Sequence, residues 1–181
     1  MKEGFLLEFT ETLKTRKSTR SYKPEQITEE ELNKVLVAGC TAPLGMAKPF
    51  NQHMTVIQNV DLMNKIADET AKAFSRPGMN PFYGAPTVVI ISSTELKAPS
   101  IEYANVGCII ENMTLAATDI GLASIYLWGF VTVIRSNPEL LKALNLPEGF
   151  TPLSAIALGY STEPLNADKE LTQTYSINYI K

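Results

Sequence analysis

The sequence predicts an α+β protein in which a small β-sheet is packed between helices. Three observations support this class. Helical and strand-like segments are interleaved, but two helices precede the first strand, so the order is not the βαβ alternation of a doubly wound domain. A nearly continuous β-branched run at 86–92 predicts a central strand that is buried on both faces. A long apolar segment at 100–120 predicts a helix that is buried on most sides.

Length and composition describe one globular domain spanning 1–181. The chain has 181 residues, of which 45% are hydrophobic and 19% are charged, and its net charge is -3. This acidity argues against nucleic acid as the main partner, because phosphate backbones require a basic face. No segment is apolar enough to span a bilayer, and Glu3 and Glu8 interrupt the N-terminal apolar stretch. We therefore expect no membrane partner and a cytoplasmic location.

The N-terminal part of the chain contains two expected helices. Apolar residues at helical spacing predict the first helix over 3–13, and a basic stretch at 14–23 follows it. Thr28 with Glu31 three residues later forms a capping box, which begins a second helix. That helix carries apolar positions at helical spacing and is expected to end near Gly39.

The middle of the chain alternates between strands, helices and loops. A loop at 41–53 contains two prolines and a glycine, and 54–57 then predicts a short strand. Asn59 can cap a helix over 61–74. A second loop at 75–85, with two prolines and two glycines, leads into the central strand.

The C-terminal part contains two further strands and one short helix. Gly121 ends the long apolar helix, and 122–127 predicts a strand that Trp128 and Gly129 break. Residues 137–139 (NPE) start a short helix, with proline at its first position. A final strand is expected over 153–158, and the tail from 162 to 181 has no clear period.

The scarce residues exclude several catalytic classes. The chain has one histidine, His53, and two cysteines, Cys40 and Cys108, with no zinc-binding spacing. No nucleophile motif accompanies His53, and neither a P-loop nor a Rossmann fingerprint is present. We therefore expect no metal site and no hydrolytic triad. Both cysteines lie in apolar, helix-like contexts and are expected to be buried thiols.

The most unusual local feature is the basic stretch at 14–23, which contains no acidic residue. In an extended chain Arg16, Ser18 and Arg20 project to the same side. Two guanidinium groups that flank a hydroxyl suit a phosphate monoester. The alternative is a solvated basic loop between two helices, and charge alone favours this alternative by about two to one.

The motif at 16–22 (RKSTRSY) and five later motifs resemble, in content and in order, the nitroreductase family of FMN-dependent oxidoreductases. The resemblance covers roughly residues 5–165. The later motifs are APLGM at 42–46, HMTVI at 53–57, FYGAP at 82–86, GLASIYLWGF at 121–130 and ALGY at 157–160.

The resemblance implies a three-layer domain whose central mixed or antiparallel β-sheet is flanked by helices. It also implies a homodimer with two non-covalently bound FMN molecules at the subunit interface. The C-terminal tail, at about 162–181, would then extend over the partner subunit. The helix Ser100–Ile120 is the best candidate for the core of the interface, because obligate interfaces are large and apolar.

The resemblance assigns roles to the basic motif. Arg16, Ser18 and Arg20 match residues that hold the phosphate, the ribityl chain and the pyrimidine edge of FMN, and Lys17 contributes mainly its backbone. The pyrimidine oxygen gains negative charge when the flavin is reduced, and a cation such as Arg20 would stabilise that charge.

The segment Leu127, Trp128 and Gly129 matches the turn whose backbone N–H groups approach the flavin N5 and O4. A glycine in this turn lets the main chain come close to a ring. Trp128 could instead be an ordinary core aromatic, since the implied role belongs to the backbone. Asn80 and Tyr83 precede the central strand and are expected to border the substrate pocket.

The sequence departs from the family pattern in two places. The loop at 47–52 (AKPFNQ) carries an apparent one-residue insertion, and Asn51 and Gln52 are the candidates for amide contacts to the ribityl chain. Beyond the last core strand the family usually has a basic residue near the phosphate. Lys169 is the candidate here, and a plain surface lysine is an equally good interpretation.

The implied activity is transfer of electrons from NADH or NADPH, through FMN, to a nitroaromatic, a quinone or a similar organic acceptor by a ping-pong mechanism. The cofactor carries the chemistry, so no catalytic side chain is expected. One alternative is a flavin-binding protein without reductase turnover, either a regulator or a flavin store. Another is a different reaction on the same fold, such as dehalogenation, flavin fragmentation or azoline oxidation.

Overall fold

The computed structural model describes residues 8–94 and 100–181. Part of the helix predicted over 3–13 lies outside the described residues. Residues 95–99, which precede the expected helix Ser100–Ile120, also lie outside them. The elements are α1 (Phe9–Thr15), α2 (Glu29–Cys40), the single-turn helices η1 (Gly45–Ala47) and η2 (Pro49–Asn51), β1 (Gln52–Ile57), α3 (Val60–Ala73), β2 (Thr87–Ser93), α4 (Ile101–Asp119), β3 (Ala123–Leu127), α5 (Gly129–Ser136), α6 (Pro138–Ala143) and β4 (Thr151–Gly159).

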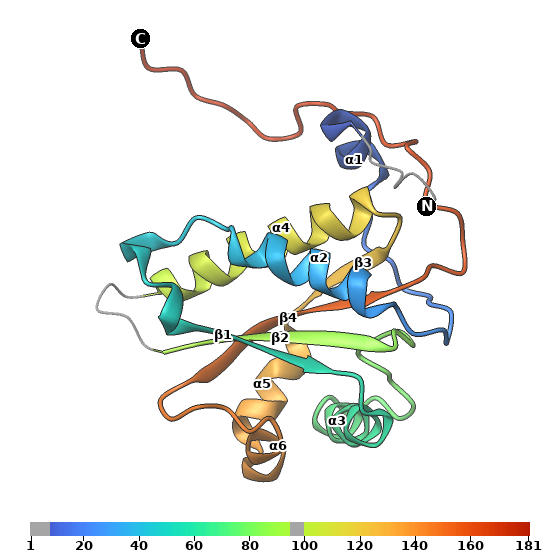
Figure 1. Ribbon diagram of the computed structural model, residues 1–181, viewed down its shortest axis with the longest axis vertical. Helices are drawn as coiled ribbons and strands as arrows, with labels where there is room; N and C mark the ends of the chain where they lie inside the picture. Colours follow the sequence, from blue (N-terminus) through green and yellow to red (C-terminus); the bar gives the residue numbers. More distant parts are fainter. Residues whose placement is uncertain (1–7, 95–99) are drawn as a thin grey trace.

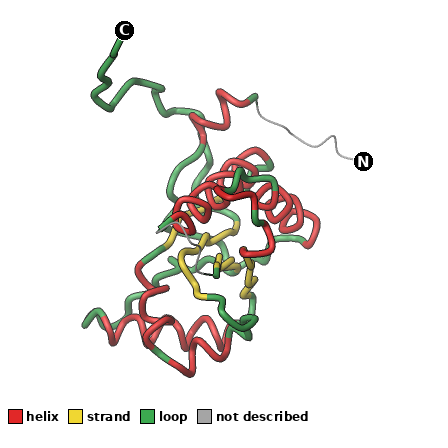
Figure 2. Tube along the Cα trace, turned by 90° about the vertical axis from the view of Figure 1, so that its left-hand side faces the viewer, coloured by secondary structure: helices red, strands yellow, loops and turns green. Residues whose placement is uncertain are grey.

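These elements form three layers. Helices α2 and α4 cover one face of the sheet, while α3, α5 and α6 cover the other face (Figure 1). The view turned by 90° shows the strands between two helical layers, with the C-terminal tail leading away from them (Figure 2). The α+β class expected from the sequence is confirmed.

The sheet has the order β1-β2-β4-β3, and all three neighbouring pairs of these strands are antiparallel. Strand β2 is buried along its whole length, as its β-branched run predicts, and β4 is buried beyond its first residue. The registers pair Ser93 with Thr151 at one end of the sheet and Thr87 with Leu158 at the other end. The edge strands β1 and β3 pair with these two central strands, so the β2–β4 register sets where the corners of the sheet lie.

Two apolar clusters fill the spaces on either side of the sheet. On the α2 and α4 side, Val35, Ile110 and Met113 pack with Ile91 and Ile156. On the opposite side, residues of α3, α5 and α6 pack with alternate strand residues; they include Met63, Ile66, Phe130, Ile134, Leu140, Ile90 and Ala155. Full burial of each such aliphatic side chain is worth about 1.5–3 kcal/mol, so the two clusters hold the layers together.

One face of α4 is exposed in the single chain, although the sequence predicts burial on most sides. Residues Tyr103, Ala104, Cys108 and Glu111 lie on this exposed face. The prediction of buried thiols is wrong for both cysteines, because Cys40 lies exposed in the last turn of α2 and Cys108 on this face. No helix among the described residues combines the length and the hydrophobicity needed to cross a membrane.

Helix α5 is absent from the expected elements, because the sequence pattern places only a break at Trp128 and Gly129. The helix contains β-branched residues, which favour strands locally. Its apolar side chains Phe130, Val131 and Ile134 are nevertheless spaced to face the core, and all three are buried. Tertiary packing therefore decides the conformation of this segment.

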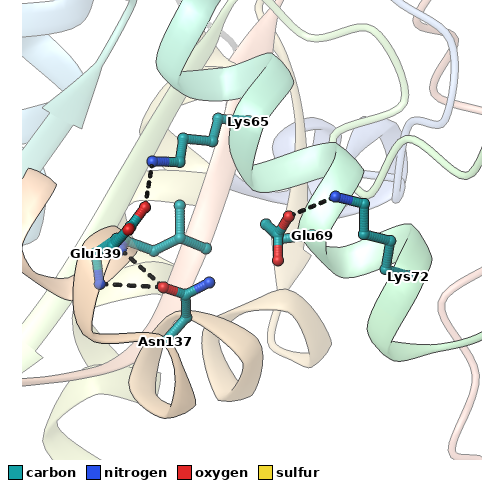
Figure 3. Close-up of polar contacts among 6 residues, drawn as sticks. Lys65, Glu69, Lys72, Asn137 and Glu139 are labelled. Atoms are coloured by element: carbon teal, nitrogen blue, oxygen red, sulfur yellow. Dashed lines mark hydrogen bonds and ion pairs between the residues drawn. The ribbon is translucent and has the colours of Figure 1, made fainter.

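Hydrogen bonds cap the short helix α6, and an ion pair links it to α3 (Figure 3). The side chain of Asn137 accepts hydrogen bonds from the backbone N–H groups of Glu139 and Leu140, as the sequence predicts for the start of a helix. The ammonium group of Lys65 lies 3.0 Å from a carboxylate oxygen of Glu139. Both ion-pair side chains are largely exposed, so the pair orients α6 more than it stabilises it.

The capping box at Thr28 ties the start of α2 to the end of β4. The carboxylate of Glu31 accepts hydrogen bonds from the backbone N–H and the hydroxyl of Thr28, and from the phenol of Tyr160 at 2.7 Å. Partial burial works to raise the pKa of Glu31, but these hydrogen bonds and nearby Lys34 outweigh it and lower the pKa. Burial and the Glu31 carboxylate raise the pKa of Tyr160 to about 12.

Replacement of Glu31 tests the contribution of this contact. We expect Glu31→Ala to lower the free energy of unfolding by about 1–2 kcal/mol at neutral pH. The pKa of Glu31 is lower in the folded chain, so its stabilising effect is present above the unfolded pKa of about 4.3 and is lost as the pH falls. Urea unfolding at neutral pH and at about pH 3 measures both effects.

Glu30 supplies the matched control for this experiment. It lies in the same helical turn, and its side chain is 80% exposed beside Lys34. Glu30→Ala should change the unfolding free energy by less than about 0.5 kcal/mol at either pH. A pH-independent loss in Glu31→Ala would contradict the assigned role of the carboxylate.

Candidate functional site

The motif at 16–22 lies beside β3, at one edge of the sheet. It follows α1, and Ser18 makes a parallel bridge with Ser124 of β3. A few residues later, Tyr22 makes an antiparallel bridge with Ser161, which follows β4. Backbone pairing at both ends therefore fixes the path of the motif. Lys17, Ser18 and Arg20 are exposed in this segment between α1 and α2, so it is also a solvated basic loop.

The side chains of this motif divide into an inner and an outer set. Thr19 and Tyr22 are buried, whereas Ser18 and Arg20 are exposed and Arg16 is half-buried. That Arg16, Ser18 and Arg20 project to the same side stays a prediction, and Arg16 is less exposed than the other two. Burial raises the pKa of the Tyr22 phenol, and the charge of nearby Arg20 opposes the rise.

Two buried hydroxyl groups beneath the motif, those of Thr19 and Ser124, lack partners. The backbone N–H of Thr19 donates to the carbonyl of Ser124 at 3.0 Å, but neither hydroxyl has a hydrogen-bond partner within the described residues. An unsatisfied buried hydroxyl costs about 1–3 kcal/mol. A hollow of about 320 Å³ lies over this part of the motif, lined by 17–21 and 161–163. Thr19 lines this hollow and Ser124 does not, and both hydroxyl oxygens are buried.

Lys169 reaches back from the C-terminal tail to the start of the motif. Its ammonium group donates to the carbonyl of Arg16 at 3.1 Å, and Lys17 donates to the carbonyl of Pro164 at 3.2 Å. Burial and the Arg16 charge lower the pKa of Lys169, while Glu111 opposes the shift. Neither Arg16 nor Lys169 forms an ion pair with a described carboxylate. Two adjacent cations that form no ion pair with a described carboxylate suit a dianionic phosphate.

The predicted flavin-edge turn lies where β3 passes into α5. Leu127 is buried, and its carbonyl accepts a hydrogen bond of 2.8 Å from the hydroxyl of Ser154. Trp128 is 55% exposed, so it is not an ordinary core aromatic. A Cβ at Gly129 would meet Phe74 at 3.5 Å, which is ordinary contact, so the packing of the chain does not require glycine there. Close approach of a ligand to the backbone would explain why a glycine stands at this position.

Asn80 and Tyr83 have different surroundings, although we expected both to border one pocket. The guanidinium carbon of Arg20 lies 5.9 Å from the centre of the Tyr83 ring, which places Tyr83 beside the basic motif. The side-chain oxygen of Asn80 accepts from the backbone N–H of Phe82 at 2.8 Å. Asn80 also lines a separate hollow with Gln26, outside the motif.

Asn51 and Gln52 lie far from the basic motif in the single chain. Asn51 donates from its side chain to the hydroxyl of Thr94, and Gln52 donates to the hydroxyl of Ser93 at 3.0 Å. Strand β1 is one edge of the sheet and β3 is the other, and Gln52 pairs at the end opposite to that of Ser18. The two segments therefore occupy opposite corners, as the blue and teal loops show (Figure 1).

The loop before Asn51 is held in place by the buried side chain of Asn105 on α4. Its oxygen accepts from the backbone N–H of Gly45 at 2.7 Å. A Cβ at Gly45 would lie 2.7 Å from side-chain atoms of Ile101, so a larger residue here would require the Ile101 side chain to move. The side-chain oxygen of Gln52 is buried and has no partner within the described part of the chain. This loop therefore also offers an unused hydrogen-bonding group.

Sequence reasoning missed two contributors to the site. The first is the N-terminus of α5, whose free N–H groups begin at Gly129. The helical spacing of Phe130, Val131 and Ile134 was the available signal, but it is short and β-branched. The second is the backbone of Ser124, which no local pattern indicates because it becomes relevant only through its pairing with Ser18.

Comparison with known proteins identifies a family and related sequences. The sequence profile of the Nitroreductase family matches residues 13–160. A protein from Methanothermobacter thermautotrophicus that carries the name NADH dehydrogenase/NAD(P)H nitroreductase is 30% identical over 167 residues, which cover 87% of this chain and 79% of that protein. A second protein of the same name, from Archaeoglobus fulgidus, is 30% identical over 148 residues, or 81% of each chain.

Solved structures show the same fold. A nitroreductase with bound FMN from Bacteroides fragilis is 29% identical, with a TM-score of 0.83 over 97% of this chain and 100% of that chain. A second nitroreductase with bound FMN, from Desulfitobacterium hafniense, is 25% identical, with a TM-score of 0.79 over 94% and 98% of the two chains.

Inorganic phosphate tests the cation pair directly. We expect phosphate to raise the melting temperature relative to chloride at equal ionic strength, by about 2–4 °C for about 1 kcal/mol of binding. Arg16→Gln and Lys169→Gln should each remove most of this rise, because each loses one of the two cations. Lys142→Gln, an exposed lysine on α6, is the control and should retain the rise. An equal rise in all three variants would show that phosphate acts elsewhere.

Proposed function

The chain belongs to the nitroreductase family, and on that basis we propose that it is an FMN-dependent oxidoreductase that passes electrons from NADH or NADPH to a small organic acceptor. The observation that carries the proposal is the proximity of Lys169 to Arg16, neither of which forms an ion pair with a described carboxylate. Names of the relatives and the bound FMN in two similar structures support the choice of cofactor and reductant.

The residues present fit the phosphate end of FMN. The charges of Arg16 and Lys169 are close enough to interact, and Lys17 adds a third cation beside the tail. Ser18 is exposed next to them and can hydrogen-bond the ribityl chain. The hollow beside them is lined by the polar residues Ser18, Arg20 and Ser21.

Two charged or polar groups serve the ring end. Arg20 carries a positive charge at the outer side of the motif, and α5 presents free N–H groups that begin at Gly129. A helix N-terminus and a guanidinium both stabilise negative charge. FMN, when bound, supplies two-electron hydride chemistry. The protein's own part is to bind the phosphate, to orient the ring, and to stabilise the charge that reduction adds at the ring edge.

The acceptor is proposed to be a nitroaromatic, a quinone or a similar compound, and the reductant and acceptor use the same face in turn. The exposed side chain of Trp128 lies beside the proposed ring edge, so this face is open in the chain described. An open face that admits two different substrates successively predicts ping-pong kinetics. Because the ring carries the electrons, the scarcity of histidine and cysteine is no obstacle to this activity.

A second copy of the chain is proposed to complete each site. The basic motif and the loop with Asn51 and Gln52 occupy opposite corners of one sheet, so one chain cannot bring them to the same FMN. A two-fold dimer joins the motif of one copy to the loop of the other. The exposed face of α4 is the proposed interface core, and the tail at 162–181 is proposed to extend over the partner subunit.

The visible spectrum and its response to reductant test the proposed activity. Purified protein should show flavin maxima near ~370 and ~450 nm, which NADH or NADPH should bleach and a nitroaromatic should restore. Arg16→Ala should weaken FMN binding by about 10- to 100-fold, because it removes charge-assisted hydrogen bonds.

Lys23→Ala is the matched control, since Lys23 is exposed in the same basic stretch and uses only its backbone N–H, toward Tyr160. It should bind FMN as the wild type does. Bound FMN that NADH and NADPH leave unbleached would mean a flavin-binding protein without reductase turnover. Full FMN retention in Arg16→Ala would contradict the phosphate assignment.

Mixed dimers test the division of the site between two copies. Arg16→Ala impairs the motif, and the loop variant Asn51→Ala/Gln52→Ala impairs the opposite corner. Each alone should lose both sites of a dimer. After the two variants are refolded together, random pairing should restore about a quarter of the wild-type sites, as titration with FMN would measure. No recovery would contradict a shared site.

A further inference from the structure

We propose that Tyr83 is a positioning residue for Arg20, and that the neighbouring Phe82 fixes Tyr83 to the N-terminus of α5. The pair Phe82–Tyr83 then sets the relative position of the two groups that stabilise negative charge at the flavin ring edge. The inference rests on the proposed function, because it assigns this charge to bound FMN.

The guanidinium of Arg20 contacts an aromatic ring and a backbone carbonyl, and its charge also acts on the phenol of Tyr22. Its carbon lies 5.9 Å from the centre of the Tyr83 ring, and Nη1 donates to the carbonyl of Ser18 at 3.3 Å. It forms no ion pair with a described carboxylate. An aromatic face attracts a cation without neutralising its charge. Tyr83 can therefore hold Arg20 in place and leave its full charge available to a ligand.

The backbone at Tyr83 is unusual for a bulky residue. Tyr83 has φ 57 and Gly84 has φ 83, so two successive residues lie in the left-handed region. The carbonyl of Phe82 accepts from the N–H of Ala85 at 3.0 Å, which closes a tight turn around them. Glycine or asparagine fits such a position with less strain than tyrosine. A tyrosine there indicates that the ring has a use that the turn itself does not need.

Phe82 anchors this turn to the other side of the proposed ring edge. It is 1% exposed and packs edge-on against Phe130, with ring centres 5.0 Å apart and an interplanar angle of 81°. Phe130 is the second residue of α5, directly after Gly129. The side chain of Asn80 accepts from the N–H of Phe82 at 2.8 Å and so fixes the turn further.

These contacts form one continuous connection. Arg20 rests against Tyr83, Tyr83 follows the buried Phe82, and Phe82 packs against the first turn of α5. Arg20 and the N-terminus of α5 both stabilise the negative charge that reduction adds to the ring edge. The contacts hold these two groups at a fixed separation. Loss of the Tyr83 ring should weaken binding of reduced FMN more than binding of oxidised FMN, because only the former gains from a well-placed Arg20.

Tyr83→Gly is the informative variant, because it removes the ring and relieves the positive φ. Its melting temperature without FMN should be equal to or above that of the wild type. Its affinity for reduced FMN should fall about two- to fivefold more than its affinity for oxidised FMN. The two-electron midpoint potential of bound FMN should therefore become more negative by about 10–20 mV. Tyr83→Phe keeps the ring and should retain the wild-type potential.

A double-mutant cycle with Arg20→Ala shows whether the ring acts through Arg20. In the Arg20→Ala background, Tyr83→Gly should shift the potential no further. An unchanged potential in Tyr83→Gly, or an equal shift in both backgrounds, would overturn the inference while leaving the proposed function intact. Wild-type protein that binds no FMN would overturn the proposed function, and this inference with it.

Discussion

The antiparallel pairing of β2 with β4 is the constraint on which the rest of the structure depends. Both strands are buried between the two helical layers, so a one-residue slip in their register would exchange the side chains that pack in the two apolar clusters. Because β1 pairs with β2 and β3 pairs with β4, this register also sets the position of the two edge strands relative to each other. The basic motif pairs with the β3 edge, and the loop with Asn51 and Gln52 continues into the β1 edge. The separation of the two half-sites is therefore a property of the core.

Local signals predicted the parts of the fold that depend on nearest neighbours in the chain. The capping box at Thr28 and the Asn59 and Asn137 caps are all present, because a cap is formed within one helical turn. Helix α5 was not predicted, because burial of its apolar face outweighs the local preference of its β-branched residues. The exposure of Cys108 was also missed, since periodicity cannot say which apolar face of α4 lacks a neighbour within the chain.

The candidate site divides in the same way. The types and spacing of Arg16, Ser18 and Arg20 are enough to suggest a phosphate-binding segment, because the chemistry is carried by residues close together in the chain. The contact between Lys169 and Arg16 joins residues 153 positions apart, and the sequence could only suggest it through a family resemblance. The orphaned hydroxyls beneath the motif and the ring of Tyr83 beside Arg20 follow from tertiary contacts, which no pattern in the sequence reports.

The opposite-corner arrangement of the motif and the Asn51 loop has a consequence for chain concentration. If two copies must associate before either can hold FMN fully, the fraction of chains that retain the cofactor depends on the chain concentration. Dilution then releases FMN even when the fold of each chain is intact, and a newly made chain waits for a partner before it loads. Cofactor content would therefore follow expression level more steeply than protein amount does.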